Sequence, residues 1–282
     1  INSKAFSNCT GLKEIKFNDN IKEIGRYAFS LCNSLEKITF PTNEFKVCET
    51  AFYNCKGLKE VTIPNNLICE GGFIFSYCSA LEKVTFEEGY KQINEGMFSF
   101  CINLKEVILP STLEKIGYYA FKNCSKLEEI VIPKNVIEIG YALEECSGLT
   151  TITIPFIGKG KEYTSRKVST IFNGKIPSSL EEIIITNDEY IYKDAFKGCS
   201  NVKKIVINKE VTTIETAALA DCTSLEEITL PFVGTSANAT KYAAVFGAIF
   251  GYKSSGYTVN NGNIIKYSDE FINKLYGTQP EN

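Results

Sequence analysis

Hydrophobic residues recur along this chain with a period of 23 residues, and the cysteines show the period most clearly. Nine of the eleven cysteines stand in one column, spaced by 23 residues, once by 22, and interrupted by an insertion before Cys199. The column comprises Cys9, Cys32, Cys55, Cys78, Cys101, Cys124, Cys146, Cys199 and Cys222. A fixed period of this length indicates a solenoid, because one such unit cannot bury its own apolar face without a stacked neighbour.

Each repeat contains an apolar triplet of the form L-x-x-I-x-I, and ten triplets occur from Leu12/Ile15/Phe17 to Leu225/Ile228/Leu230. The last two members of each triplet are two residues apart, which is the period of a strand with one buried face. Prolines follow several triplets and are typical of strand ends. We therefore predict ten short parallel strands, about 4.8 Å apart, along a body on the order of 50 Å long.

A second motif lies between the strands, clearest as Ile21-x-x-Ile24-Gly25-x-x-Ala28-Phe29-x-x-Cys32. It is too short for a long helix, so it predicts a turn followed by a brief helical or extended piece.

The complete unit, from Ile116 to Pro133, closely resembles the BspA-like leucine-rich repeats of bacterial and protist surface proteins, and the resemblance covers residues 1–231. It implies a right-handed, curved leucine-rich repeat solenoid of about ten repeats of ~23 residues, with a parallel β-sheet on one face. It also implies an extracellular role in adhesion to host or matrix proteins. The departures are local: Cys48, Asn94, Tyr192 and Glu215 replace the glycine, and the segment 67–72 is out of register.

The predicted solenoid spans residues 1–251 and includes two longer, insertion-type repeats at 156–177 and 232–251. Both insertions begin with F-[IV]-G and end with I-F-x-G or I-F-G. Such insertions commonly project from one face and bind partners, and the alternative is that they only fill a longer turn.

Residues 252–282 follow as a loop and C-terminal capping segment. The Gly/Ser/Asn-rich run from Tyr252 to Asn263 predicts a loop. The spacing of apolar residues over 264–276 predicts a short amphipathic helix, with Ser268 as its N-cap, that covers the end of the core. Because the chain opens inside the second half of a repeat, we expect it to belong to a longer parent.

The charge and residue types exclude several functions. Thirty basic and thirty-three acidic residues give a net charge of −3, which lacks the basic excess of nucleic-acid-binding proteins. No uninterrupted apolar run is long enough to insert into a membrane. Histidine is absent, which excludes Ser/His and Cys/His catalysis, and phosphate-loop, Cys-x-x-Cys and calcium-loop motifs are also missing. We expect a monomer without catalytic residues, cofactor or metal; a carbohydrate-active enzyme with paired carboxylates is an alternative.

The cysteine column distributes its thiols along an axis, whereas a metal site needs ligands that converge on one point. We therefore expect small buried thiols. The off-register Cys48 and Cys69 are the only pair for which a disulfide is an alternative.

Charged residues beside the triplets alternate in sign from repeat to repeat. Lys13, Glu36, Lys59, Glu82, Lys105 and Glu128 form one column, and the next column alternates in the opposite phase. Stacking would place each charge beside opposite charges on neighbouring strands. The alternation fails where like charges double, and these positions are candidates for a partner or cation, the alternative being a solvated face: Glu181, Glu182, Lys203, Lys204, Glu226 and Glu227.

Tyrosines are the other candidate contacts, because they offer a large contact area at low entropic cost. Tyr163 and Tyr242 lie in the insertions, and others lie between strands. The alternative for each is core packing. The leading hypothesis is a non-enzymatic cell-surface or secreted module that binds a protein or glycan of a host, matrix or neighbouring cell. An intracellular protein-assembly scaffold is an alternative, and a secretion signal or anchor in the parent would distinguish the two.

Overall fold

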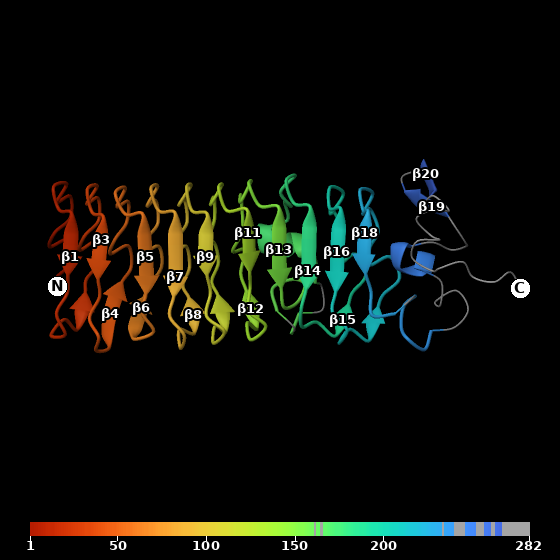
Figure 1. Cartoon of the computed structure of the whole chain (residues 1–282), viewed down its shortest axis with the longest axis horizontal. Coiled ribbons are helices and arrows are strands. Elements are labelled where there is room, and N and C mark those ends of the chain that lie inside the picture. The colour runs from red at the N-terminus through yellow and green to blue at the C-terminus, as the bar shows by residue number, and fades with distance from the viewer. Residues whose placement is uncertain are drawn as a thin grey trace, which may run out of the picture.

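The chain forms an elongated parallel β-solenoid, in which successive repeats add strands along one axis (Figure 1). The computed structural model describes residues 1–160, 162–163, 166–232, 234–239, 246–251, 257–260 and 263–266. Ten strands, called the main sheet here, each contain the middle member of one predicted triplet, which confirms the ten predicted strands. They are β1 (Glu14–Lys16), β3 (Lys37–Thr39), β5 (Glu60–Ile63), β7 (Lys83–Phe86), β9 (Glu106–Ile108), β11 (Glu129–Val131), β13 (Thr151–Ile154), β14 (Glu182–Ile185), β16 (Lys204–Ile207) and β18 (Glu227–Thr229).

Stacking of equivalent residues sets the register of the main sheet. Its strands pair in parallel, in the groups β1-β3, β5-β7-β9 and β11-β13-β14-β16-β18. Ile15 lies opposite Ile38, and Ile183 lies opposite Ile205. Because a shift of one residue would turn these side chains from the core to solvent, burial of the triplets specifies the register strongly.

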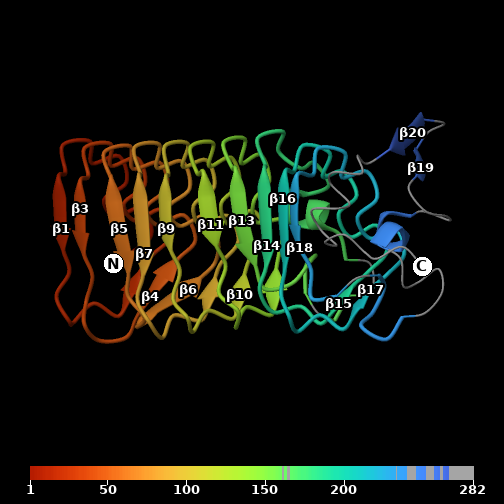
Figure 2. The ribbon, with the colours of Figure 1, turned by 45° about the vertical axis from the view of Figure 1, so that its right-hand side comes forward.

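Shorter strands form a second row on the other side of the core (Figure 2). They are β2 (Glu23–Ile24), β4 (Phe45–Cys48), β6 (Leu67–Glu70), β8 (Gln92–Ile93), β10 (Lys115–Ile116), β12 (Glu138–Ile139), β15 (Tyr190–Ile191) and β17 (Thr213–Ile214). They pair as β2-β4-β6, β8-β10-β12 and β15-β17. The brief segment that the sequence predicts between the main-sheet strands is therefore extended and not helical. The pairing of the second row is interrupted after β6, within the segment 67–72 that departs from the repeat pattern.

Tight turns join the second row to the main sheet, and they stack on one another through backbone hydrogen bonds. Phe29 N–H donates to Ala51 O at 2.8 Å, and Leu31 N–H donates to Tyr53 O at 2.8 Å. Tyr27 and Leu31 have φ angles of 54° and 62°, which non-glycine residues adopt infrequently. The hydrogen bonds to the next repeat therefore hold a backbone conformation that an isolated unit would disfavour.

Stacked phenylalanine rings run through the core beside the cysteine column. Phe29, Phe52, Phe75, Phe98 and Phe121 form a ladder with ring centroids 5.2–6.0 Å apart and nearly parallel planes. The thiols of the cysteine column donate to phenylalanine carbonyls of preceding repeats, as the Sγ of Cys78 does to Phe52 O at 3.4 Å. All column cysteines except the half-buried Cys9 are buried. Seven thiols satisfy a backbone acceptor in this way: those of Cys32, Cys55, Cys78, Cys101, Cys124, Cys146 and Cys222.

The apolar ends of both insertions pack into the core. The 3-10 helix η1 (Val168–Phe172) buries Val168, Ile171 and Phe172. The 3-10 helix η3 (Phe246–Phe250) lies at the equivalent place in the second insertion, and its last three residues are buried. Ile171 O accepts from Leu143 N–H and Ile249 O accepts from Leu219 N–H, so each helix replaces the usual Ala-Phe turn. These residues of the insertions therefore lie in the core and do not project from it.

The last described elements form an antiparallel hairpin of β19 (Tyr257–Asn260) and β20 (Asn263–Lys266). The predictions of a loop over 257–260 and of a helix over 264–266 are therefore wrong. The sequence between the strands, Asn261-Gly262, is typical of two-residue hairpin turns, and this signal was outweighed by helical spacing. The remainder of the expected helix, with Ser268, lies outside the described residues.

Candidate functional site

Ion pairs between neighbouring strands neutralise much of the outer face of the main sheet. Lys105 Nζ lies 2.8 Å from Glu82 Oε2, and Lys83 Nζ lies 2.9 Å from Glu106 Oε2. The hydrogen bond from Lys105 lowers the pKa of Glu82 from its ordinary value. These side chains are well exposed, so solvent screens each pair and it contributes little to stability. The alternating columns thus form the ladder of opposite charges that the sequence predicts.

The doubled charges also have oppositely charged neighbours across the strands, which compensate the like charges beside them. Lys204 contacts both Glu182 and Glu227 at 3.3 Å, and Lys203 contacts Glu181 at 2.8 Å. Glu226 N–H donates to Lys203 O, which places Glu226 next to the same lysine. Residues of like charge are adjacent along a strand, but residues of opposite charge face each other across strands.

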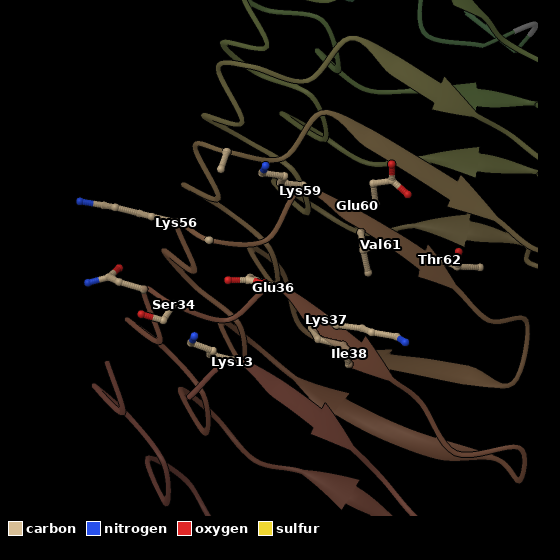
Figure 3. Close-up of a pocket in the computed structure, with 13 residues that line it drawn as sticks. Lys13, Ser34, Glu36, Lys37, Ile38, Lys56, Lys59, Glu60, Val61 and Thr62 are labelled. Carbon is tan, nitrogen blue, oxygen red and sulfur yellow. The ribbon is translucent and has the colours of Figure 1, made fainter. Parts of the chain in front are cut away.

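A shallow hollow at the N-terminal end of the main sheet is lined by the same ladder (Figure 3). Lys13, Lys37 and Lys59 extend over it from successive repeats, together with Glu36 and Glu60. Charged side chains of both signs line it, beside Ile38 and Val61. It therefore offers little desolvated surface to anchor a partner.

The centre of the main sheet differs from this hollow, because apolar side chains are exposed on its outer face. Ile108 is 42% exposed and Val131 is 51% exposed. Parallel register continues the column through Thr153 to the half-buried Ile184 and Val206. We call these five residues the apolar column.

Two carboxylates flank the apolar column without an ion-pair partner. Glu128 and Glu129 are exposed, and the described part of the chain places no lysine or arginine within ion-pair distance of either. Glu129 lies opposite Thr151 of β13, where other repeats carry a charge. The centre of the sheet thus combines an apolar strip with uncompensated negative charge. No sequence pattern singled out Ile108 and Val131, because β-branched residues are common in strands.

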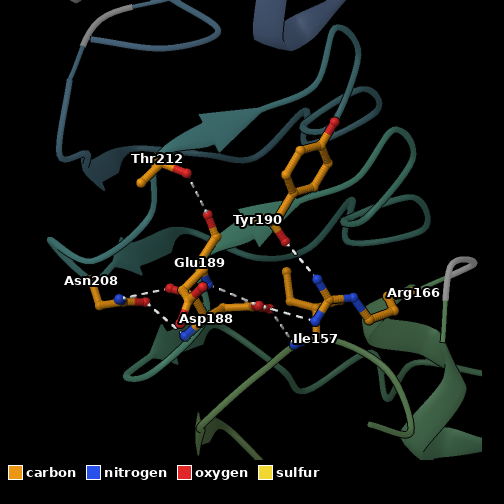
Figure 4. Close-up of polar contacts among 7 residues, drawn as sticks. All are labelled: Ile157, Arg166, Asp188, Glu189, Tyr190, Asn208 and Thr212. Carbon is orange, nitrogen blue, oxygen red and sulfur yellow. Dashed lines mark hydrogen bonds and ion pairs between the residues drawn. The ribbon is translucent and has the colours of Figure 1, made fainter. Parts of the chain in front are cut away.

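The first insertion is fastened to the solenoid by a buried ion pair (Figure 4). Arg166 Nη1 donates to Asp188 Oδ1 at 3.0 Å, and Nη2 donates to Tyr190 O at 2.9 Å. Ile157 N–H donates to Asp188 Oδ2 at 3.0 Å. The two charged side chains are only 4% and 2% exposed. No sequence pattern marked these residues, because the pair has no counterpart in other repeats.

The two tyrosines predicted in the insertions have different outcomes. Tyr163 is 46% exposed at the edge of the first insertion, where its N–H donates to Gly160 O. Tyr242 lies outside the described residues. Tyr163 contacts Gly160, which is paired with Glu138 of the second row, whereas the doubled charges lie on the main sheet. The structure therefore gives no single site that unites all the predicted residues.

The disulfide alternative for Cys48 and Cys69 is wrong, since both are free thiols. In the pairing of β4 with β6, Cys69 lies opposite Val47, one residue from Cys48. Successive strand residues point to opposite faces, so the two thiols project in opposite directions. Cys69 Sγ lies 3.2 Å from Tyr90 Oη, whereas Cys48 Sγ lies 3.7 Å from Glu23 Oε1.

Comparison with known families identifies the repeats. Six copies of the BspA type leucine-rich repeat region match residues 1–76, 71–184 and 169–243. The chain belongs to this family. BspA-type repeats build protein-interaction scaffolds and are not a known enzyme class, and the resemblance noted in the sequence is confirmed.

Solved structures with similarity to this BspA-type chain include three bacterial proteins. The pneumococcal vaccine antigen PcpA is 23% identical, with 78% of this chain and 68% of that chain covered and a TM-score of 0.43. A leucine-rich repeat protein from Bacteroides ovatus is 22% identical, with coverages of 82% and 76% and a TM-score of 0.41. A leucine rich cell surface protein from Faecalibacterium prausnitzii is 22% identical, with coverages of 90% and 66% and a TM-score of 0.37. A search of curated proteins finds no match.

Two further features of the described residues bear on function. Within them, no group of three or more histidine, cysteine, aspartate or glutamate side chains is placed to hold a metal ion. The same residues include no helix with the length and apolar character needed to cross a bilayer.

Burial determines which thiols of this BspA-type chain react, and alkylation should reveal it. Burial raises the pKa of Cys101 and of Cys146 to about 12, so at pH 8 their reactive thiolate forms are scarce. We expect iodoacetamide to label the half-buried Cys9 and Cys48 first, and the buried column about a hundredfold more slowly until the protein unfolds. Mass spectrometry of labelled peptides at pH 8 measures this. Equal labelling rates for Cys101 and Cys9 would contradict the packing of the column.

Proposed function

We propose that this chain is a non-enzymatic, surface-exposed or secreted adhesion module whose main sheet binds a host or matrix protein. The observation that carries the proposal is the centre of the sheet, where the exposed Ile108 and Val131 lie beside the unpaired Glu128 and Glu129. Membership of the BspA-type repeat family supports an interaction role. The extracellular location and the adhesive role come from the family resemblance.

The chemistry of the site suggests which partner surface fits it. A partner's apolar side chains would cover the apolar column, and a lysine or arginine would reach the two glutamates. Binding energy concentrates in desolvated central contacts, while complementary charge mainly sets specificity and association rate. β9 pairs with β7 and β11 pairs with β13, so the backbone that carries these residues is already ordered and little ordering entropy is lost on binding.

Surface plasmon resonance with immobilised fibronectin and fibrinogen tests the proposal, at low and at physiological salt. We expect saturable binding that survives physiological salt and that weakens about tenfold or more in Val131→Glu. Ile68→Glu is the matched control, because Ile68 is an exposed isoleucine on β6 of the second row. It should change affinity by less than about twofold.

Two outcomes would contradict the proposal: no binding to either matrix protein, or the same loss of affinity in both variants. Circular dichroism melting should first show that both variants keep the wild-type fold, since exposed substitutions usually change stability by about 0.5 kcal/mol or less.

An intracellular protein-assembly scaffold is the second candidate, and the free thiols favour it. All eleven cysteines are unpaired, whereas extracellular proteins commonly form disulfides. Labelling of intact cells with a membrane-impermeant amine reagent distinguishes the two. Labelling of the chain before lysis supports the surface location, and labelling only after lysis supports the scaffold.

A further inference from the structure

A cluster of tyrosines surrounds one lysine on the second row, on a different face from the main sheet. The rings of Tyr118, Tyr119 and Tyr141 lie at the end of β10 and beyond β12, with centroids 5.2, 6.3 and 6.4 Å apart. Lys159, from the first insertion, places its ammonium 3.9 Å from the Tyr141 centroid and 5.1 Å from the Tyr118 centroid. A cation over aromatic faces is attracted by their negative centres, so the rings orient this ammonium.

Lys159 is held at both ends and carries an uncompensated charge. Its carbonyl oxygen accepts from Ile139 N–H at 2.7 Å, and its half-buried side chain lies against the rings. The contact with Tyr141 raises the pKa of Lys159, which keeps it protonated. No described carboxylate lies within ion-pair distance of its ammonium. By contrast, Glu138 neutralises Lys115 at 3.3 Å and Glu144 neutralises Lys122 at 2.7 Å.

Exposed apolar and aromatic side chains lie beside Lys159 or beside the next residue, Gly160. Ile137 is 57% exposed, Tyr163 is 46% exposed and Tyr118 is 39% exposed. Gly160 joins these residues, because Tyr163 N–H donates to its oxygen and a Cβ at Gly160 would lie only 2.8 Å from Ile137 O. A shallow groove continues from Tyr118 along the second row, lined by Gln92, Glu95, Lys115, Glu138 and Gly140.

The fold itself does not require this cluster, as the second insertion shows. That insertion is attached by the same kind of bridge, with Thr213 paired to Ser236 as Glu138 is paired to Gly160. Ile214 N–H likewise donates to Thr235 O. Thr235 therefore stands where the first insertion has Lys159, and Lys193 and Thr216 stand where it has Tyr118 and Tyr141. Among the described residues, the second insertion is bridged without tyrosines at these positions, so attachment alone does not explain the cluster at the first.

We infer that Lys159 and its tyrosines form a second binding site, which takes a carboxylate side chain from an acidic and partly apolar segment of a partner protein. The ammonium is already oriented, so little side-chain entropy is lost when a carboxylate binds it. Apolar side chains next to that carboxylate would lie on Ile137 and Tyr163. The site is independent of the proposed main-sheet function and stands even if the main sheet binds nothing.

Nuclear magnetic resonance titration of the full chain with 13C-labelled tyrosine tests the site. The probe is an acetylated hexapeptide of alternating glutamate and leucine, and its glutamine analogue is the control ligand. We expect the ring signals of Tyr118 and Tyr141 to shift saturably with the glutamate peptide. The glutamine analogue should bind with an affinity that is lower by about tenfold or more.

Matched variants separate this site from general attraction to a positive charge. Lys159→Gln should lower affinity about tenfold, whereas Lys159→Arg, which keeps both the charge and the ring contact, should stay within about threefold of wild type. Lys13→Gln, on the main sheet, removes the same charge elsewhere and should leave affinity unchanged. Equal affinity of Lys159→Gln and wild type, or equal binding of both peptides, would overturn the inference. Binding of oligoguluronate, an acidic glycan, without binding of the glutamate peptide would overturn the assignment of a protein partner.

Discussion

Phe75→Ala should lower the free energy of unfolding by about 3–5 kcal/mol, the cost of truncating a fully buried phenylalanine. Phe75 is fully buried, and its ring stacks on Phe52 at 5.2 Å and on Phe98 at 5.5 Å. The cavity would therefore open in the middle of the ladder, where two neighbouring repeats lose packing at once. Urea denaturation followed by circular dichroism measures the change.

Phe6→Ala is the internal control for this prediction. Phe6 is 44% exposed at one end of the same ladder and stacks on Phe29 alone, at 5.1 Å. Its loss should cost about 1 kcal/mol or less, because less apolar surface leaves water there on folding. Equal destabilisation by the two variants would contradict nearest-neighbour stacking as the source of stability.

Asp188→Ala should destabilise the region around the first insertion by about 3–5 kcal/mol, because it leaves the buried Arg166 guanidinium without its counter-charge. Arg166→Met should cost less, since the Asp188 carboxylate would keep the N–H groups of Ile157 and Glu189. Hydrogen exchange of the backbone around Ile157 and η1, measured by mass spectrometry, reports this local loss directly.

The double variant Arg166→Met/Asp188→Leu provides the control. Replacing both partners of a buried ion pair by apolar side chains is often neutral, so the double variant should be more stable than Asp188→Ala. If it is less stable, the pair itself and not the unpaired charge supplies the stability.

The repeating part of the fold was predictable because one physical pattern is written many times. The cysteine column and the apolar triplets gave ten strands and their register, since each buried residue must stack on its counterpart. The charge ladder followed from the same register. The doubled charges belong to the same ladder, because the register places Glu182 opposite Lys204.

Features that occur once in the chain were not predictable in the same way. Arg166 and Asp188 are 22 residues apart and meet only because the insertion folds back on the solenoid. Lys159 reaches the tyrosines of two earlier repeats for the same reason. The tyrosines were recognised as candidates, but their partner was not, because it comes from outside the repeat pattern. The hairpin of β19 and β20 had a local signal that helical spacing obscured.

Hydrogen-exchange mapping of the chain with and without saturating bound matrix protein tests the central claim most directly. If the main sheet is the binding surface, protection should appear in the main-sheet strands β9, β11, β13 and β14, around Ile108 and Val131, and the second-row strands β2, β4 and β6 should exchange as in the free chain. Protection confined to the second row or to the turns would contradict a binding role for the main sheet.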